Sequence, residues 1–165
     1  MAETSNYGEP PLLGPEHKRL AAFAGNWRAE GTSYGAGQNP EAPRANGATW
    51  SSEETVRLLD GGFFLISDER ATVGLDLLVT HSIIGWDKAA GQYVSHAAEN
   101  HGHYRRYEIA VSGRIWTFDS GTERARIEFS EDGTCQTVFW EWRPTGDRWL
   151  PLCERLNRRI DTGAT

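Results

Sequence analysis

From residue 27 to residue 160, hydrophobic and polar residues alternate in short runs that are separated by turn residues. Alternation with a period of two is typical of β-strands that bury one face. Glycine-rich segments such as "DGG", "SGT" and "EDG" lie between the runs, and no helical pattern interrupts them. The pattern predicts about ten antiparallel strands, at residues 27–34, 48–58, 63–72, 77–86, 92–100, 103–111, 114–120, 124–130, 135–143 and 149–160.

A short helix is predicted before the first strand, in the segment "GPEHKRLAAFAG" at residues 14–25. Pro15 suits the first helical turn, and Gly25 suits the stop. Leu20 and Phe23 share one face of this helix. So narrow an apolar face needs another surface to pack against, and only strands follow it.

Ten strands with short connections must form two sheets or close on themselves, and the even up-and-down spacing favours closure. We therefore predict an all-β fold: one antiparallel barrel over residues 14–160, capped by the helix, with flexible tails at 1–13 and 161–165. Such a barrel leaves room inside for one small ligand. The long polar connection at residues 35–47 is expected at the open mouth, either as a lid or as a loose insertion.

Turn residues also predict which side chains face inward. A turn at Asp132 and Gly133 places Ile127 opposite Val138 and Ala125 opposite Trp140. A turn at Ser112 and Gly113 places Ile109 opposite Trp116 and Tyr107 opposite Phe118. We expect an aromatic pocket for a small hydrophobic molecule, although side chains could also fill the barrel completely. The residues predicted to line it are Ile109, Trp116, Phe118, Val138 and Trp140.

The segment "ENHGHYRRYE", residues 99–108, concentrates imidazoles, guanidiniums and phenols, and it allows two registers. The preferred register has a two-residue turn at His101 and Gly102 and pairs His96 with Tyr107. It brings a cluster to the cavity side that consists of His96, Asn100, His103, Arg105 and Tyr107. The alternative, a three-residue turn over residues 100–102, pairs Glu99 with His103 and removes His96 from the cluster.

Composition narrows the function classes. The chain has 165 residues and a net charge of −6, which repels phosphate backbones and anionic lipids, so we expect neither nucleic acid nor membrane as partner. The N-terminal segment lacks a signal-peptide pattern, and the two cysteines, Cys135 and Cys153, suit a reducing compartment, so a cytoplasmic location is expected. No CxxC, GxSxG or Walker motif occurs.

Several motifs resemble a known group. The segment "GNWRAEG", residues 25–31, is similar to the start of lipocalin-like (calycin) barrels. The segments "GGFFLISDE", "IIGWDKAAGQYV" and "ERLNRRI" resemble a family of small bacterial lipocalin-like proteins catalogued as a domain of unknown function, over residues 14–160. The resemblance implies a lipocalin-like barrel in which Trp27 plugs the closed end. The more distant nitrobindin group binds haem through a histidine near the C-terminal end of its barrel, and this chain has no histidine after His103.

The first functional hypothesis is therefore binding of a small hydrophobic or aromatic molecule, without a cofactor. The alternative is a cofactor-independent cyclase, isomerase or lyase with His96 as base, Tyr107 as proton donor and Arg105 as anchor, and with His103 beside them. The spacing from His101 and His103 to Glu108 resembles the first cupin motif, but the histidine of the second motif has no counterpart, so no metal is expected.

Further polar residues lie within predicted strands. Glu54 and Glu141 are such carboxylates, and parity points Glu141 outward. Glu154 could face into the cavity or into solvent, and His81 could be a core histidine or a working one, so both stay candidate ligand-binding residues, together with Asn100. Homodimerisation through an exposed strand face is also left open.

Overall fold

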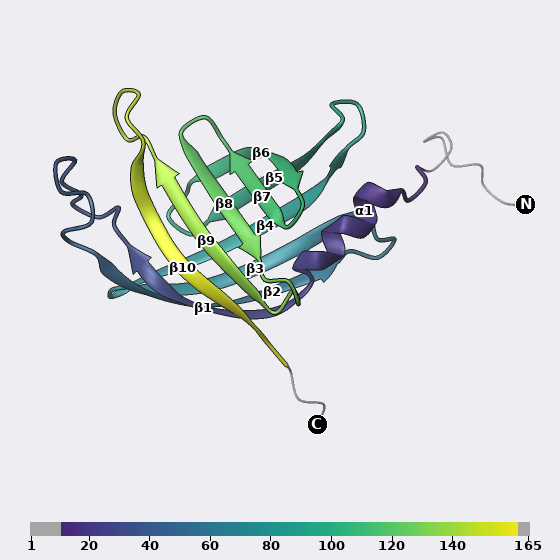
Figure 1. Cartoon of the computed structure of the whole chain (residues 1–165), viewed down its shortest axis with the longest axis horizontal. Helices are drawn as coiled ribbons and strands as arrows, with labels where there is room; N and C mark the ends of the chain where they lie inside the picture. The colour runs from purple at the N-terminus through teal and green to yellow at the C-terminus, as the bar shows by residue number, and fades with distance from the viewer. Residues whose placement is uncertain (1–10, 162–165) are drawn as a thin grey trace, which may run out of the picture.

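The computed structural model describes residues 11–161, which form a closed ten-stranded antiparallel barrel in simple meander order (Figure 1). This confirms the predicted fold, and each predicted strand is present with small shifts at its ends. The strands are β1 (Gly25–Ser33), β2 (Ala48–Leu58), β3 (Phe64–Val73), β4 (Asp76–Asp87), β5 (Gln92–Glu99), β6 (Tyr104–Ser112), β7 (Ile115–Asp119), β8 (Glu123–Phe129), β9 (Cys135–Trp142) and β10 (Leu150–Ile160). Residues 1–10 and 162–165, most of the two predicted tails, lie outside the described residues.

The predicted helix closes one end of the barrel (Figure 1). It consists of α1 (Pro15–Leu20) and a 3₁₀ turn (Ala21–Phe23), and its buried side chains are Leu20 and Phe23. The ring of Phe23 packs edge-on against Trp116 at 4.9 Å between centroids. The indole nitrogen of Trp27 donates a hydrogen bond of 2.8 Å to the carbonyl of Phe23. Trp27 is fully buried among the packed side chains at this closed end of the barrel, as the resemblance implied. These side chains are called the closed-end core below.

The hairpin registers agree with the sequence in one case and differ in another. The β8–β9 pairing is confirmed, with Ile127 opposite Val138. The β6–β7 pairing is shifted by two residues, so that Ile109 faces Phe118. The turn there is Gly113 and Arg114, with Gly113 at φ +59°, because a two-residue hairpin readily takes glycine first. A two-residue shift keeps the parity, so the predicted inner face is unchanged.

The preferred register for β5 and β6 is wrong, and the three-residue turn is the one observed. Ser95 faces Tyr107, and the amide of Glu99 donates to the carbonyl of His103 at 3.0 Å. The Glu99 carboxylate also accepts hydrogen bonds from the amides of His101 and His103, at 3.2 and 3.1 Å. These side-chain bonds stabilise the longer turn, and as a result His96 faces away from the barrel interior.

The barrel interior has two halves. Closed-end side chains form a packed core, and a cavity of about 650 Å³ occupies the other half. The β1–β2 and β9–β10 loops lie at the open end, opposite α1 (Figure 1). In the β1–β2 loop, Gln38 bonds to the indole of Trp142 at 2.8 Å and to the carbonyl of Pro151 at 2.6 Å. The predicted long loop is therefore tied to the barrel rim.

Neither helical segment within residues 11–161 has the length and hydrophobicity of a transmembrane span.

Candidate ligand-binding site

One wall of the cavity is mostly aromatic and aliphatic. It is formed by inward-facing side chains of β6 to β9, because alternate residues of each strand point inward. The ring centroids of Tyr107 and Trp140 are 5.5 Å apart at 71°, and those of Phe118 and Trp140 are 6.4 Å apart. This aromatic wall comprises Tyr107, Phe118, Ile127, Val138 and Trp140.

The opposite wall is polar and comes from β2, β3 and β10, with Gln136 added from β9. Arg155 forms an ion pair with Glu69, with 2.5 Å between Nη1 and Oε1. The hydroxyl of Ser52 donates to Glu69 at 2.8 Å, and that of Ser67 donates to Glu54 at 2.5 Å. These five residues, together with Gln136 and Asn157, are called the polar wall below; all of them line the cavity except Ser52, which is buried.

A glycine allows Arg155 to occupy this place. Gly31 pairs with Arg155 on β10 and with Trp50 on β2. A Cβ at position 31 would lie 2.6 Å from the Cα of Arg155 and 2.0 Å from the carbonyl oxygen of Glu154, so only glycine fits between the strands. The Arg155 guanidinium lies 4.7 Å from the ring centre of Trp50.

The polar wall holds two carboxylates in adjacent strands. Glu54 lies directly opposite Glu69 in the β2–β3 ladder, where two like charges repel each other. Burial is the larger cause and the nearby Glu69 carboxylate the smaller one, and together they raise the pKa of Glu54 to about 7. Burial lowers the pKa of Arg155, but the neighbouring Glu69, Cys153 and Glu54 together outweigh burial, so the net shift is upward. Arg155 and Glu69 therefore form an ion pair, while Glu54 has no cation within ion-pair distance among residues 11–161.

Two buried polar atoms of the polar wall have no hydrogen-bond partner within residues 11–161: Nε of Arg155 and Oδ1 of Asn157. Asn157 is 3% exposed, and its Nδ2 donates to Gln136 Oε1 at 2.9 Å. Leaving such an atom unpaired costs about 1–3 kcal/mol. Because both residues line the cavity, a bound molecule could supply the missing partners.

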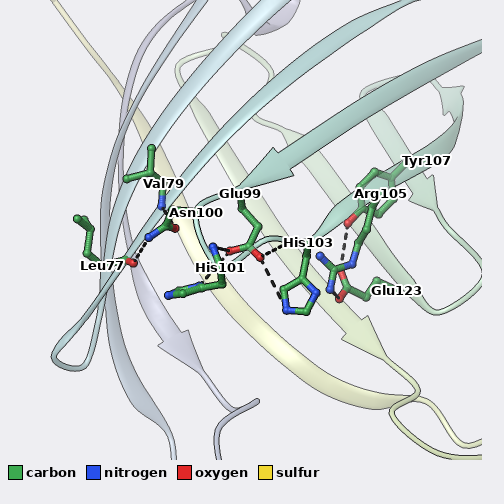
Figure 2. A network of polar contacts seen from close by, with 9 residues as sticks. All are labelled: Leu77, Val79, Glu99, Asn100, His101, His103, Arg105, Tyr107 and Glu123. Carbon is green, nitrogen blue, oxygen red and sulfur yellow. Dashed lines mark hydrogen bonds and ion pairs between the residues drawn. The ribbon is translucent and has the colours of Figure 1, made fainter.

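At the mouth, the β5–β6 hairpin carries a second polar network (Figure 2). The Nδ1 of His101 lies 3.0 Å from a carboxylate oxygen of Glu99, and the Nε2 of His103 lies 3.9 Å from the other. Beside them, Glu123 forms an ion pair with Arg105 at 2.9 Å and accepts a hydrogen bond from the phenol of Tyr107 at 3.0 Å. The two groups of contacts follow one another along the rim, as Figure 2 shows.

The network shifts two pKa values in opposite directions. Burial, then the Glu123 carboxylate, raises the pKa of the Tyr107 phenol far above its ordinary value. Tyr107 is therefore a neutral hydrogen-bond donor at every physiological pH. Burial raises the pKa of Glu99, but the amides of His101 and His103 and the two imidazoles outweigh it, so the net pKa is lowered.

Several residues predicted for the site lie outside the cavity. His96 faces outward, with its Nδ1 2.5 Å from the hydroxyl of Tyr104. His81 is exposed and pairs with Asp68 at 2.5 Å, because β4 presents it on the outer face and not to the core. Both positions correct the predictions, and the predicted base of the enzyme hypothesis is absent from the cavity.

One further prediction, for Asn100, is corrected, and the alternative left open for Glu154 is decided. Asn100 bonds to the amide of Val79 and the carbonyl of Leu77, at 2.8 and 3.0 Å, and so joins the hairpin to β4 (Figure 2). Glu154 faces outward because Cys153 and Arg155 take the inward positions of β10. It binds Arg44 of the long loop at 2.5 Å and the hydroxyl of Tyr34 at 3.0 Å.

The other predicted residues do face inward, at two depths. Trp116 and Ile109 belong to the closed-end core. The cavity is lined by Phe118, Val138, Trp140, Tyr107, Arg105 and His103. Sequence reasoning missed the polar wall, although the alternation from Trp50 through Ser52 and Glu54 to Val56 places polar residues on a buried face.

Within residues 11–161, no three histidine, cysteine or acidic side chains converge as a metal site would require. The two cysteines are free thiols, and burial raises the pKa of Cys153 to about 11.

Comparison with known proteins agrees with this fold. The sequence model of the family described as "Protein of unknown function (DUF1579)" matches residues 13–107. The chain belongs to this family. A comparison with curated proteins found no match to this DUF1579 chain.

Two solved structures are similar to the barrel. Rv2717c from M. tuberculosis is 12% identical with a TM-score of 0.65, covering 91% of this chain and 100% of that one. The S-type phycobiliprotein lyase CPES from Guillardia theta is 10% identical with a TM-score of 0.54, covering 93% and 99%. At these identities the likeness concerns the fold alone.

Proposed function

We propose that the protein binds a small molecule whose hydrophobic or aromatic body lies against the aromatic wall and whose polar group meets the polar wall. The observation that carries this proposal is the cavity of about 650 Å³, which has the size of small-molecule sites. A mostly apolar pocket with a few converging polar groups is the usual composition of such sites.

The unpartnered atoms of the polar wall support a ligand with polar groups of its own. A cavity kept only for packing reasons would be filled by larger side chains or lined by apolar ones, since unfilled volume and unpaired polar atoms both reduce stability. Here Arg155 and Asn157 place such atoms at the cavity wall. A bound molecule would offset this cost.

The experiment uses N-phenyl-1-naphthylamine, an uncharged aromatic probe that fluoresces in apolar sites. We expect saturable binding to the wild-type protein at micromolar concentrations. Ala97 lines the cavity and Ala98 on the same strand is exposed, so they form a matched pair. Ala97→Phe should weaken probe binding at least tenfold by filling the cavity, whereas Ala98→Phe should leave it unchanged.

Two results would overturn the binding proposal: no saturable signal from the wild-type protein, or equal affinities of the Ala97→Phe and Ala98→Phe variants. Circular dichroism and a thermal unfolding curve establish that each variant is folded before its affinity is compared.

A cofactor-independent isomerase or cyclase is the second candidate function, and Glu54 is the observation that favours it. Its pKa of about 7 suits an acid or base that works near neutral pH, and its carboxyl group lines the cavity. The neutral Tyr107 phenol would polarise a carbonyl group. A barrel of similar fold is named a lyase, so the fold is compatible with chemistry on a bound molecule.

Proton exchange tests this candidate. Aromatic ketones that bind the cavity are incubated with protein in D₂O, and exchange at the carbon beside the carbonyl is followed by NMR. Exchange that Glu54→Gln abolishes without loss of binding supports catalysis. The absence of exchange for every ketone that binds rules out the enzyme hypothesis and leaves binding intact.

A further inference from the structure

The walls and mouth of the cavity carry more negative than positive groups. Five carboxylates line it: Glu54, Glu69, Asp76, Glu99 and Glu123. The guanidiniums that line it are those of Arg105 and Arg155. Carboxyl groups therefore outnumber guanidiniums by five to two among the described lining residues. A site with this imbalance favours a positively charged ligand over an anionic one.

We propose that the ligand carries a positively charged nitrogen, which binds the polar wall with Glu54 as its counter-ion while its apolar body lies against the aromatic wall. This inference rests on the proposed binding function and names the chemical class of the ligand. It assigns the charged end of the molecule to β2 and the apolar end to β6 to β9.

Within residues 11–161, the ion pairs leave two of the five carboxylates without a cation, Glu54 and Asp76, and Asp76 is exposed to solvent. Arg155 is paired with Glu69 and Arg105 with Glu123, at 2.5 and 2.9 Å. Glu99 is bonded by the amides and an imidazole of its own hairpin. Within residues 11–161, Glu54 has the hydroxyl of Ser67 as its side-chain donor and no cation within ion-pair distance. A buried carboxylate without a cation is stabilised when a bound ammonium group forms an ion pair with it.

A second observation on the same wall also favours a donor-rich ligand. Among residues 11–161, the Oδ1 of Asn157 is an acceptor that has no hydrogen-bond partner, and Asn157 is 3% exposed. Asn157 pairs with Ala29 on β1, which pairs with Ser52 on β2, so it lies on the same side of the cavity as Glu54. An ammonium or amidinium group has the N–H donors that these acceptors lack.

An anionic ligand fits less well. It would have to displace a carboxylate from Arg155 or Arg105, since both guanidiniums are already paired. It would also add negative charge beside Glu54 and Glu69, which repel each other already. The unpartnered Nε of Arg155 needs only an uncharged acceptor, such as an ether or carbonyl oxygen of the ligand.

Binding of a cation should release a proton below pH 7. The charged groups that face Glu54 are Glu69 on β3 and Arg155 on β10. Burial of Glu54 and repulsion from the Glu69 carboxylate raise the pKa of Glu54 to about 7. A cation at Glu54 stabilises its ionised form and lowers that pKa. Near pH 6 the free protein holds the Glu54 proton, and the complex gives it up.

Three indole compounds of similar shape test the proposal by isothermal titration calorimetry: tryptamine is cationic, 3-methylindole is neutral and indole-3-acetate is anionic. We expect tryptamine to bind at least tenfold more tightly than 3-methylindole, and indole-3-acetate to bind most weakly. Glu54→Gln should reduce tryptamine affinity to that of 3-methylindole and leave 3-methylindole unaffected. Glu53→Gln, on the outer face beside it, is the matched control and should change neither affinity.

Proton release provides an independent readout. At pH 6 the binding heat of tryptamine should depend on the ionisation enthalpy of the buffer for the wild type and not for Glu54→Gln. The proposal is overturned if 3-methylindole or indole-3-acetate binds as tightly as tryptamine, or if Glu54→Gln leaves tryptamine affinity unchanged. If N-phenyl-1-naphthylamine binds and tryptamine does not, the charge assignment alone is wrong. If no probe binds, the binding function itself is wrong.

Discussion

At the scale of single residues, Glu54 and Glu69 differ most from what strand alternation predicts, because they are carboxylates at inward positions. Inward positions of a strand normally take apolar side chains, yet two adjacent inward positions of β2 and β3 take carboxylates. Their environment depends on Arg155, which lies 86 residues from Glu69 along the chain. Turn residues and alternation predict contacts within a strand and its hairpin, so the aromatic wall could be predicted. The polar wall depends on a contact between distant strands, so it could not.

The raised pKa of Glu54 predicts a specific effect of pH on stability. Its folded value of about 7 lies above the ordinary 4.5, so the folded state holds a proton that the unfolded state releases between these values. Unfolding free energy should therefore fall as pH rises from about 4.5 to about 7 and then level off. Glu54→Gln, which can still accept the Ser67 hydrogen bond, removes this loss.

We expect Glu54→Gln to match the wild type near pH 4 and to exceed it by a few kcal/mol at pH 8, as measured by urea unfolding across this range. Glu53→Gln, whose side chain is exposed and pairs with Arg28, should change stability by less than about 1 kcal/mol. Parallel pH curves for Glu54→Gln and wild type would show that folding does not shift the pKa of Glu54 and would contradict the argument.

At the scale of elements, the strands were predictable and one hairpin was not. Alternation locates all ten strands, because each one buries a single face. The β5–β6 turn was misread because His101 and Gly102 suit a two-residue turn, while the outcome depends on the Glu99 side chain, which bonds two amides of the loop. A one-residue change of turn length moved His96 from the cavity to the outer surface.

Glu99 should therefore stabilise this hairpin measurably. Glu99→Ala removes a carboxylate that accepts two backbone hydrogen bonds, and we expect a loss of about 1–3 kcal/mol in unfolding free energy. Amide hydrogen exchange of residues 100–103 should accelerate, while exchange in the closed-end core should change only with global stability. The lowered pKa of Glu99 means that its contribution is present at neutral pH and is lost as pH falls through that pKa.

Glu108→Ala is the control, because this carboxylate is exposed and pairs with its neighbour Arg106 on the outer face of β6. Unchanged exchange at residues 100–103 in Glu99→Ala would mean that the turn is determined by its backbone alone. The role assigned to the Glu99 side chain would then be wrong.

At the scale of the whole molecule, the Arg155–Glu69 pair links β10 to β3 across the two intervening strands β1 and β2. The first and last strands of a meander meet only when the barrel closes, so this pair joins distant parts of the chain. Both side chains are nearly buried, at 10% and 13% exposure. Breaking such a pair from one side leaves an uncompensated buried charge, which typically costs about 3–5 kcal/mol.

A double-mutant cycle tests this closure. Arg155→Met should lower the unfolding free energy by about 3–5 kcal/mol, because it leaves Glu54 and Glu69 facing each other without a cation. Glu69→Gln leaves Arg155 with Glu54 as its nearest carboxylate and should cost less. The double variant should be more stable than Arg155→Met alone, since it removes the second charge as well. Additive losses in urea unfolding would show that the two residues act independently, and the pair would then not contribute to holding β10 and β3 together across the cavity.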